Sequence, residues 1–169
     1  MIRILIVDDH PVVRTGLRSI IETQPDFDVI GEAETGEEAV RRVAYDGPDL
    51  VLMDLQMPGI GGAQAVTQIT SLPDSPHVMI LTTYDTDSDV LTALDAGATG
   101  YLLKDAPPDE LFQAIRQAAS GQTVLAPSVA SKLVTRVQGH GTDPNRRPRP
   151  RGRLSEIASR AWALALVPS

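Results

Sequence analysis

The stretch that decides the fold of this chain is DLVLMDLQMPG, residues 49–59. Four apolar residues, 50–53, run directly into the carboxylate of Asp54, and a turn follows at Pro58 and Gly59. A continuous apolar run that is bounded by turn residues is typical of a strand buried on both faces of a parallel sheet. Asp54 then lies at the carboxyl end of that strand, which is where open α/β sheets place their sites.

The rest of residues 1–121 alternates apolar strands with amphipathic helices. Strands are predicted at residues 2–7, 28–33, 50–53, 77–82 and 100–103, and helices at about 11–23, 35–45, 61–71, 85–96 and 107–120. The second helix begins with Thr35 and Glu38 at capping-box spacing. Strict alternation predicts an α/β domain with a doubly wound, five-stranded parallel sheet, flavodoxin-like in the order 2-1-3-4-5.

Composition excludes several classes of protein. The 169 residues contain no cysteine, so neither a disulfide framework nor thiolate chemistry is expected. No apolar run approaches the roughly 20 residues of a membrane span. The apolar start of the chain breaks at Asp8 and Asp9, without the apolar length or the cleavage site of a signal peptide. We therefore expect a cytoplasmic protein.

The net charge of −7 conceals an asymmetry along the chain. Residues 1–138 hold 9 basic and 20 acidic side chains, a net charge of −11, whereas residues 139–169 hold 6 arginines and 2 acids, a net charge of +4. An acidic body is not a nucleic-acid-binding surface as a whole. Only the short basic segment has the charge for such a contact.

Polar residues end four of the predicted strands, and parallel strands bring their carboxyl ends to one edge of a sheet. These residues are Asp8 and Asp9 after the first strand, Asp54 after the third, Thr82 at the end of the fourth and Lys104 after the fifth. Clustered carboxylates repel one another unless a cation compensates, and Mg²⁺ prefers such oxygen ligands. An Asp beside a metal ion, a Lys and a hydroxyl can attack phosphorus and become an aspartyl phosphate.

These residues resemble the receiver domain of two-component response regulators, a CheY-like fold. The resemblance rests on Val7-Asp8-Asp9, Met53-Asp54-Leu55-Gln56-Met57-Pro58-Gly59, Leu81-Thr82 and Tyr101-Leu102-Leu103-Lys104. The phrases DDHPVVR (8–14) and GYLLKD (100–105) are similar to the NarL/FixJ-type branch of that family. The resemblance covers about residues 1–121.

The resemblance implies a role for each residue of the site. Asp54 is the expected phosphoacceptor, and the expected Mg²⁺ ligands are Asp9, Asp54 and the backbone carbonyl of Gln56, with Asp8 acting largely through water. Thr82 and Lys104 would contact the phosphoryl group, and Tyr101 would be the aromatic switch whose ring packs inward when Thr82 moves. The implied partners are a sensor histidine kinase and a second copy of the chain, through the fourth-helix, fifth-strand and fifth-helix face. The only enzymatic activity expected is self-phosphorylation and self-dephosphorylation.

The C-terminal part of the chain departs from the NarL/FixJ pattern. After the receiver (1–121), residues 122–138 resemble a linker helix, and residues 139–169 form a Pro-, Arg- and Gly-rich tail with one short predicted helix. One helix is not a helix-turn-helix, so DNA binding by this chain is not expected. The tail is a truncated or frame-shifted remnant of the output domain, or a replacement module; the sequence leaves these alternatives open. A solvated extension is favoured over electrostatic contact with nucleic acid.

Each site residue also has an ordinary structural explanation. Asp8 and Asp9 suit a helix cap, Thr82 a strand end, Tyr101 strand packing and Lys104 a solvated charge. Because these residues are all predicted at one edge of the sheet, their separate explanations become improbable when taken together. His10 has no His or Cys companion at metal-binding spacing and is interpreted as a turn or helix-start residue, and His77 and His140 are unassigned.

Three other functions compete with the receiver interpretation. Transcription control through DNA needs an output domain that is truncated or altered here. A haloacid-dehalogenase-type phosphatase also uses an Asp nucleophile with Mg²⁺, but it needs a second Asp where this chain has Gln56. Flavin binding needs a hydroxyl- and glycine-rich loop after the first strand, and residues 8–11 have the wrong charge for it.

Overall fold

The computed structural model of the protein describes residues 1–83, 87–125 and 130. Its strands are β1 (Ile2–Val7), β2 (Phe27–Ala33), β3 (Leu50–Met53), β4 (His77–Thr82), β5 (Gly100–Leu103) and β6 (Val124–Leu125). Its helices are α1 (Pro11–Ile21), α2 (Gly36–Asp46), α3 (Gly61–Thr70), α4 (Asp87–Ala96) and α5 (Pro108–Ala119). Every strand and helix predicted for residues 1–121 is present, with ends that differ by about two residues or fewer, as is usual for helix ends. The predicted first residues of α4 lie outside the described part of the chain.

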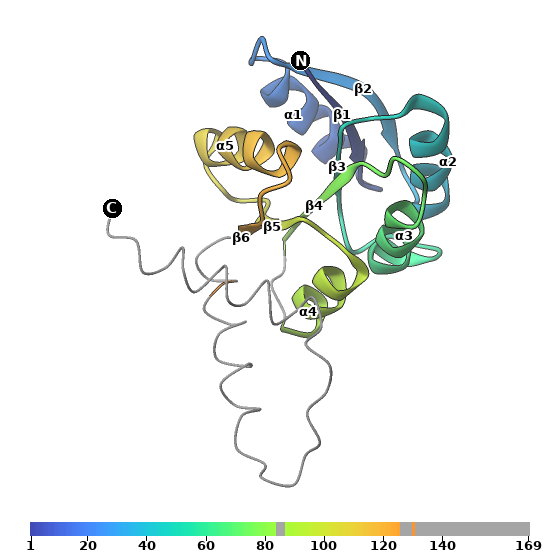
Figure 1. The fold of residues 1–169 in the computed structure, drawn as a ribbon. Helices are drawn as coiled ribbons and strands as arrows, with labels where there is room; N and C mark the ends of the chain where they lie inside the picture. The colour runs from blue at the N-terminus through green and yellow to red at the C-terminus, as the bar shows by residue number, and fades with distance from the viewer. Residues whose placement is uncertain (84–86, 126–129, 131–169) are drawn as a thin grey trace, which may run out of the picture.

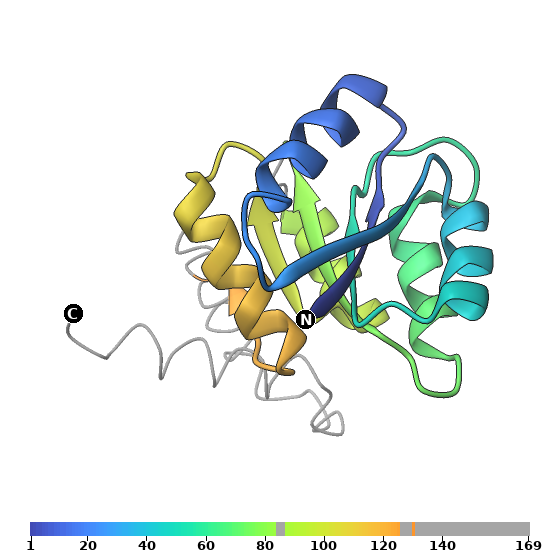
Figure 2. The same ribbon diagram turned by 90° about the horizontal axis from the view of Figure 1, so that it is seen from above.

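The strands form one parallel sheet in the order β2-β1-β3-β4-β5-β6. Helices α1 and α5 cover one face, and α2, α3 and α4 cover the other (Figures 1 and 2). The predicted doubly wound topology and the order of the first five strands are therefore confirmed. Because all strands run the same way, their carboxyl ends meet at one edge of the sheet.

The described sheet has one strand more than the five predicted. Residues 124–125, which the sequence analysis assigned to a connector, form β6 and pair in parallel with β5. Gly100 makes this pairing possible, because a Cβ atom there would lie only 2.8 Å from the Val124 carbonyl oxygen. A strand of two residues is too short to show a period-2 pattern, so the sequence carries no signal for it.

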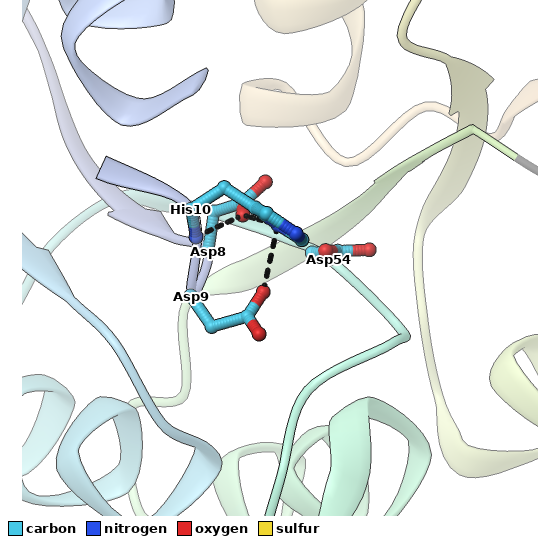
Figure 3. Close-up of side chains that lie close together, drawn as sticks. All are labelled: Asp8, Asp9, His10 and Asp54. Carbon is cyan, nitrogen blue, oxygen red and sulfur yellow. Dashed lines mark hydrogen bonds and ion pairs between the residues drawn. The ribbon is translucent and has the colours of Figure 1, made fainter. Parts of the chain in front are cut away.

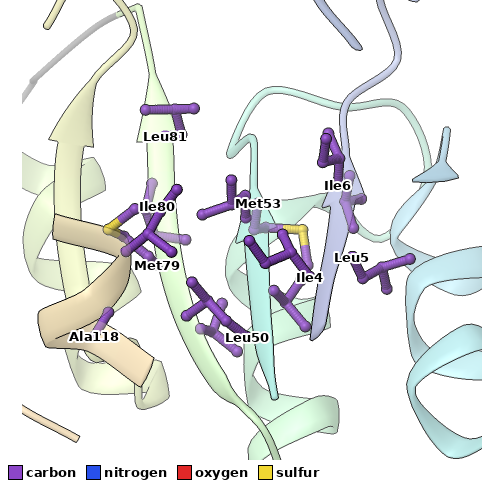
Figure 4. Packing of buried hydrophobic residues seen from close by; sticks show 14 of the residues in the cluster. Ile4, Leu5, Ile6, Leu50, Met53, Met79, Ile80, Leu81 and Ala118 are labelled. Atoms are coloured by element: carbon purple, nitrogen blue, oxygen red, sulfur yellow. The ribbon is translucent and has the colours of Figure 1, made fainter. Parts of the chain in front are cut away.

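The core lies on both faces of the central strands. All four residues of β3 are buried, as are Ile4, Leu5, Ile6 and Val7 of β1 (Figure 4). Continuous apolar runs are what strands covered on both faces require. Each such side chain contributes about 1.5–3 kcal/mol through removal from water, so the packing holds the carboxyl ends of β1 and β3 side by side.

The start of α2 follows the predicted capping pattern in part. The Thr35 side chain accepts a hydrogen bond from the Glu38 N–H at 3.1 Å. The Glu38 carboxylate reaches one residue further back than a capping box requires and accepts from the Glu34 N–H at 3.1 Å. Gly47 ends the helix in the left-handed conformation, with φ of 57°. The cap thereby also orders the turn between β2 and α2.

No helix within the described ranges has the length and apolar character to cross a membrane. The predicted linker helix from residue 128 and the predicted tail over 139–169 lie outside the described residues, apart from residue 130. The division of the chain after residue 121 therefore stays a prediction.

Candidate functional site

The register of the sheet sets the predicted site residues next to one another. Val7 pairs with Met53, so β1 and β3 end at the same level, and Met53 pairs with Ile80, so β4 continues two residues further, to Thr82. Asp8 and Asp54 each follow directly on one of these strands. Lys104 follows β5, and its N–H donates to the Thr82 carbonyl at 2.8 Å. The site is thus assembled by backbone pairing between strands that are distant in sequence.

Three carboxylates and one imidazole form a cluster at this edge. Asp8, Asp9, His10 and Asp54 each offer one ligand atom, and these atoms lie within 4.8 Å of one another (Figure 3). The side chains of Asp8 and Asp54 are 2% and 5% exposed, whereas that of His10 is 63% exposed. The cluster is therefore buried at its base and open to solvent on the His10 side.

The ammonium group of Lys104 lies against this cluster and partly compensates its negative charge. Its Nζ donates to Asp8 Oδ2 at 2.5 Å and to Asp54 Oδ2 at 3.3 Å. Three carboxylates and one ammonium group leave two uncompensated negative charges when all are ionised. That remainder equals the charge of one divalent cation.

The pKa values of the two buried carboxyl groups, Asp8 and Asp54, are shifted in opposite directions. Burial raises the pKa of Asp54 above its ordinary value, although the Gln56 N–H and the Lys104 charge oppose the effect. Burial also acts to raise the pKa of Asp8, but hydrogen bonds from Lys104 and the His10 N–H outweigh it, so that pKa is lowered. Lys104 is buried too, yet its contacts with Asp8 and Asp54 raise its pKa. The ammonium group of Lys104 therefore compensates the negative charge of Asp8 more than that of Asp54.

Asp9 carries a buried oxygen that has no hydrogen bond. Its Oδ1 lies 2.9 Å from His10 Nδ1, but the angle is not that of a hydrogen bond, and Nδ1 instead bonds Asp8 Oδ1 at 3.0 Å. A buried carboxylate oxygen without a partner is costly. The three carboxylates of the cluster offer the oxygen donors that Mg²⁺ prefers. The residues present therefore fit a hard divalent cation.

The two predicted switch residues are both buried. Thr82 is 1% exposed at the end of β4, and Tyr101 is fully buried on the neighbouring β5. Ile80 pairs with Tyr101 across these two strands. Tyr101 therefore lies inward in this structure, on the strand that leads to Lys104.

Asp8 and Asp9 do not cap helix α1. The N-cap residue is His10, and no side chain caps the helix. The Asp8 carboxylate accepts instead from the His10 N–H at 2.8 Å, which bends the chain directly after β1. The structural explanation considered for this acidic pair is thus wrong, and both carboxylates are left for the cluster.

Two residues of the site were missed by the sequence analysis. His10 joins the acidic cluster, and the only sequence signal for it is that it follows Asp8 and Asp9 directly. Arg14 is buried on α1, where its Nη1 donates to the Asp8 carbonyl at 2.6 Å and its Nη2 to Glu34 at 3.0 Å. No pattern in the sequence marks Arg14, because its partners come from the end of β1 and the turn after β2.

Comparison with known proteins identifies the class of this domain. A profile of the response regulator receiver domain matches residues 4–116. The chain therefore belongs to the response regulator receiver family, which favours this class over the phosphatase and the flavin-binding protein.

Individual relatives lie in the NarL/FixJ-type branch, to which this chain also belongs. The transcriptional regulatory protein LiaR of Bacillus subtilis is 43% identical over 141 residues, which is 83% of this chain and 67% of LiaR. The nitrate/nitrite response regulator protein NarL of Escherichia coli is 37% identical over 160 residues, which is 92% of this chain and 74% of NarL. A two-component response regulator of the LuxR family from an Aurantimonas species superposes with a TM-score of 0.77 at 37% identity, over 82% of this chain and 99% of the other.

Proposed function

We propose that this protein accepts a phosphoryl group on Asp54 from a sensor histidine kinase, in a Mg²⁺-dependent reaction, and thereby switches a protein-interaction surface in two-component signal transduction. The observation that carries the proposal is the surroundings of the Asp54 carboxylate. It lies 3.3 Å from Lys104 Nζ and in one cluster with two further carboxylates. Family membership supports the same conclusion.

Mg²⁺ would be held by Asp9, Asp54 and the Gln56 backbone carbonyl, with Asp8 contributing largely through water. When bound, the ion supplies Lewis-acid stabilisation of the negative charge that develops on phosphoryl oxygens. The unpartnered Asp9 oxygen and the uncompensated negative charge of the cluster support this assignment.

The transfer is a substitution at phosphorus. An Asp54 carboxylate oxygen forms the new P–O bond, while the P–N bond of the kinase phosphohistidine breaks and its electron pair returns to the imidazole. Lys104 shifts hydrogen bonds from carboxylate to phosphoryl oxygens, and Thr82 donates its hydroxyl to another. Water later attacks the phosphorus, the P–O bond to Asp54 breaks, and inorganic phosphate leaves, which restores the Asp54 carboxylate. Self-phosphorylation and self-dephosphorylation are the only reactions proposed.

The switch follows from the charge that the phosphoryl group adds. That group brings about −1.5 to −2 charges and three acceptor oxygens. Movement of Thr82 toward it changes the packing beside Tyr101, which carries the change to the α4–β5–α5 face. We expect a homodimer through this face.

Control of transcription is the second function that an observation favours. LiaR is named a transcriptional regulatory protein and NarL a nitrate/nitrite response regulator, so the family supports a DNA-directed output. The chain would exert it through its C-terminal region or through a partner.

The test is intact mass after incubation with acetyl phosphate, with and without Mg²⁺, for the wild type and Asp54→Asn. We expect one Mg²⁺-dependent phosphoryl adduct on the wild type and none on the variant. An adduct that persists in Asp54→Asn would place the phosphoacceptor elsewhere, and no adduct under any condition would refute the proposal.

A further inference from the structure

The loop between β3 and α3, residues 54–60, carries two residues of the proposed site and is tied down at both ends. At its start, the Gln56 N–H donates to Asp54 Oδ1 at 3.2 Å. At its end, the Ile60 N–H donates to Glu37 Oε1 at 3.1 Å. Glu37 belongs to the first turn of α2, which lies beside α3 on the same face of the sheet (Figures 1 and 2). One end of the loop is therefore held by a helix that contributes no residue to the acidic cluster.

Close packing between α2 and the loop reinforces this hydrogen bond. Gly59 adopts the left-handed conformation, with φ of 87°, and a Cβ atom there would lie 2.7 Å from Glu37 Oε1 and 2.9 Å from Oε2. Both carboxylate oxygens thus lie against the backbone of the loop. Beside them, a Cβ atom on Gly36 would lie 2.7 Å from Ile60 Cγ1. These two glycines let the start of α2 approach the loop closely enough for the Glu37 carboxylate to reach the Ile60 N–H.

The two ties of the loop respond differently to the proposed chemistry. Gln56 bonds a carboxylate oxygen of the residue that is proposed to be phosphorylated, so metal or phosphorus at that carboxylate competes with this hydrogen bond. The hydrogen bond from Ile60 ends on Glu37, whose carboxylate has no part in the proposed transfer. Its charged acceptor makes it roughly twice as strong as a bond between neutral groups. The Glu37 contact is therefore the tie that persists while Asp54 reacts.

We propose that Glu37 is a positioning residue that fixes the loop between β3 and α3, and with it the Gln56 backbone carbonyl, one of the Mg²⁺ ligands of the proposed function. The inference rests on the proposed function and adds to it a residue that acts on the metal site through the loop alone. Residues that hold metal ligands in place typically change metal affinity about 10–100-fold when they are replaced.

Two replacements of Glu37 separate the hydrogen bond from the charge. Glu37→Ala removes both, whereas Glu37→Gln removes the charge and keeps a side-chain carbonyl oxygen that accepts from the Ile60 N–H. Asp46→Ala is the matched control, because Asp46 lies at the other end of α2, where its carboxylate pairs with Arg42 at 3.3 Å. The control thus removes the same charge and one polar contact from the same helix.

The experiment measures the Mg²⁺ affinity of the full chain by calorimetry, and the Mg²⁺ dependence of its phosphorylation by acetyl phosphate. We expect Glu37→Ala to weaken Mg²⁺ binding about tenfold and to raise the half-saturating Mg²⁺ concentration equally. The rate at saturating Mg²⁺ should stay within about twofold of the wild type, because Asp54, Thr82 and Lys104 are unchanged. Glu37→Gln should keep its Mg²⁺ affinity within about threefold, and Asp46→Ala within about twofold.

Amide hydrogen exchange gives a readout that needs no metal ion. In EDTA, the Ile60 amide should exchange about tenfold faster in Glu37→Ala than in the wild type, and at nearly the wild-type rate in Glu37→Gln. An unchanged Mg²⁺ affinity or an unchanged Ile60 exchange rate in Glu37→Ala would overturn the inference. Equal losses of Mg²⁺ affinity in Glu37→Ala and Glu37→Gln would also overturn it, because they would indicate an effect of charge alone.

Failure of the proposed function has a different signature. In that case the wild type itself would neither bind Mg²⁺ nor form an adduct with acetyl phosphate, and the inference would fall with the metal site. Failure of the inference alone leaves the wild type phosphorylated in a Mg²⁺-dependent reaction, with Glu37→Ala indistinguishable from it.

Discussion

At the scale of single residues, Asp54 serves the proposed chemistry at a cost to the folded state. Burial raises its pKa, so the folded protein favours the protonated group more than the unfolded chain does. A group of this kind contributes stability below its unfolded pKa and loses it as the pH rises through the folded pKa. At neutral pH the ionised Asp54 therefore destabilises the metal-free fold.

Replacing Asp54 by Asn should stabilise the metal-free protein. The amide keeps the size of the side chain and removes the buried charge, so we expect a gain of about 1 kcal/mol, or about 3 °C in Tm for a chain of this length. Thermal unfolding followed by circular dichroism at pH 7 in EDTA measures it. Mg²⁺ should raise the Tm of the wild type and not that of the variant. A lower Tm for Asp54→Asn without metal would contradict the argument.

Asp8 should show the opposite dependence on pH. Its folded-state pKa lies below the ordinary value of 3.8, chiefly because hydrogen bonds from Lys104 and His10 outweigh the effect of burial. The stability that it contributes is present above the unfolded pKa and is lost as the pH falls through the folded pKa. Urea unfolding between about pH 5 and pH 2 should therefore show a shallower loss of stability for Asp8→Asn than for the wild type. Parallel curves for the two proteins would refute this assignment.

At the scale of elements, the first turn of α3 approaches the end of β3 so closely that only glycine fits. A Cβ atom on Gly62 would lie 2.6 Å from Leu55 Cα and 2.7 Å from the Asp54 carbonyl oxygen, both backbone atoms. Gly62→Ala should displace the loop that carries Asp54 and destabilise the fold by about 2 kcal/mol.

Gly16 is the matched control for this prediction. It lies within α1, and a Cβ there would have no neighbour within 4 Å. Gly16→Ala should stabilise the protein by about 0.5–1 kcal/mol, because alanine loses less backbone entropy in a helix. Urea unfolding of both variants tests the pair, and a similar effect for the two would show that the close approach at Gly62 is unimportant.

Helix α1 also supports the loop after β1 that is proposed to bind Mg²⁺, through Arg14. The buried guanidinium donates to the Asp8 carbonyl at 2.6 Å and to Glu34 at 3.0 Å, so it joins the loop after β1 to the turn after β2. Arg14→Met keeps the apolar stem and removes both hydrogen bonds, and we expect roughly tenfold weaker Mg²⁺ binding, as for other residues that orient metal ligands. Calorimetry measures the affinity, with Arg18→Met as a control on the same helix. Equal loss in both variants would indicate a general effect of charge.

At the scale of the whole molecule, the acidic body and the basic C-terminal segment should be energetically separate. Removing residues 139–169 changes the net charge from −7 to −11. We expect the Tm to change by no more than about 2 °C, because described residues between Ile4 and Val124 already form one buried hydrophobic cluster. A fall well beyond that range would mean that the tail packs on the receiver, contrary to the solvated extension favoured above.

Most of the fold was within reach of sequence reasoning because its signals are local. Apolar runs such as residues 50–53, the cap at Thr35 and the stop at Gly47 act within a few residues, and alternation of strands and helices leaves few topologies. The edge that collects Asp8, Asp54 and Lys104 follows directly from that topology.

The tertiary structure alone decided the features that depend on contacts between distant segments. It added β6 at the end of the sheet, the burial of Arg14 against the Asp8 carbonyl and the inclusion of His10 in the acidic cluster. The difference is physical: helices and strands are selected by short-range hydrogen bonding and periodic burial, which each segment encodes for itself. The charge state and donor set of a site depend instead on distances of a few ångströms between segments, which exist only after the chain has packed.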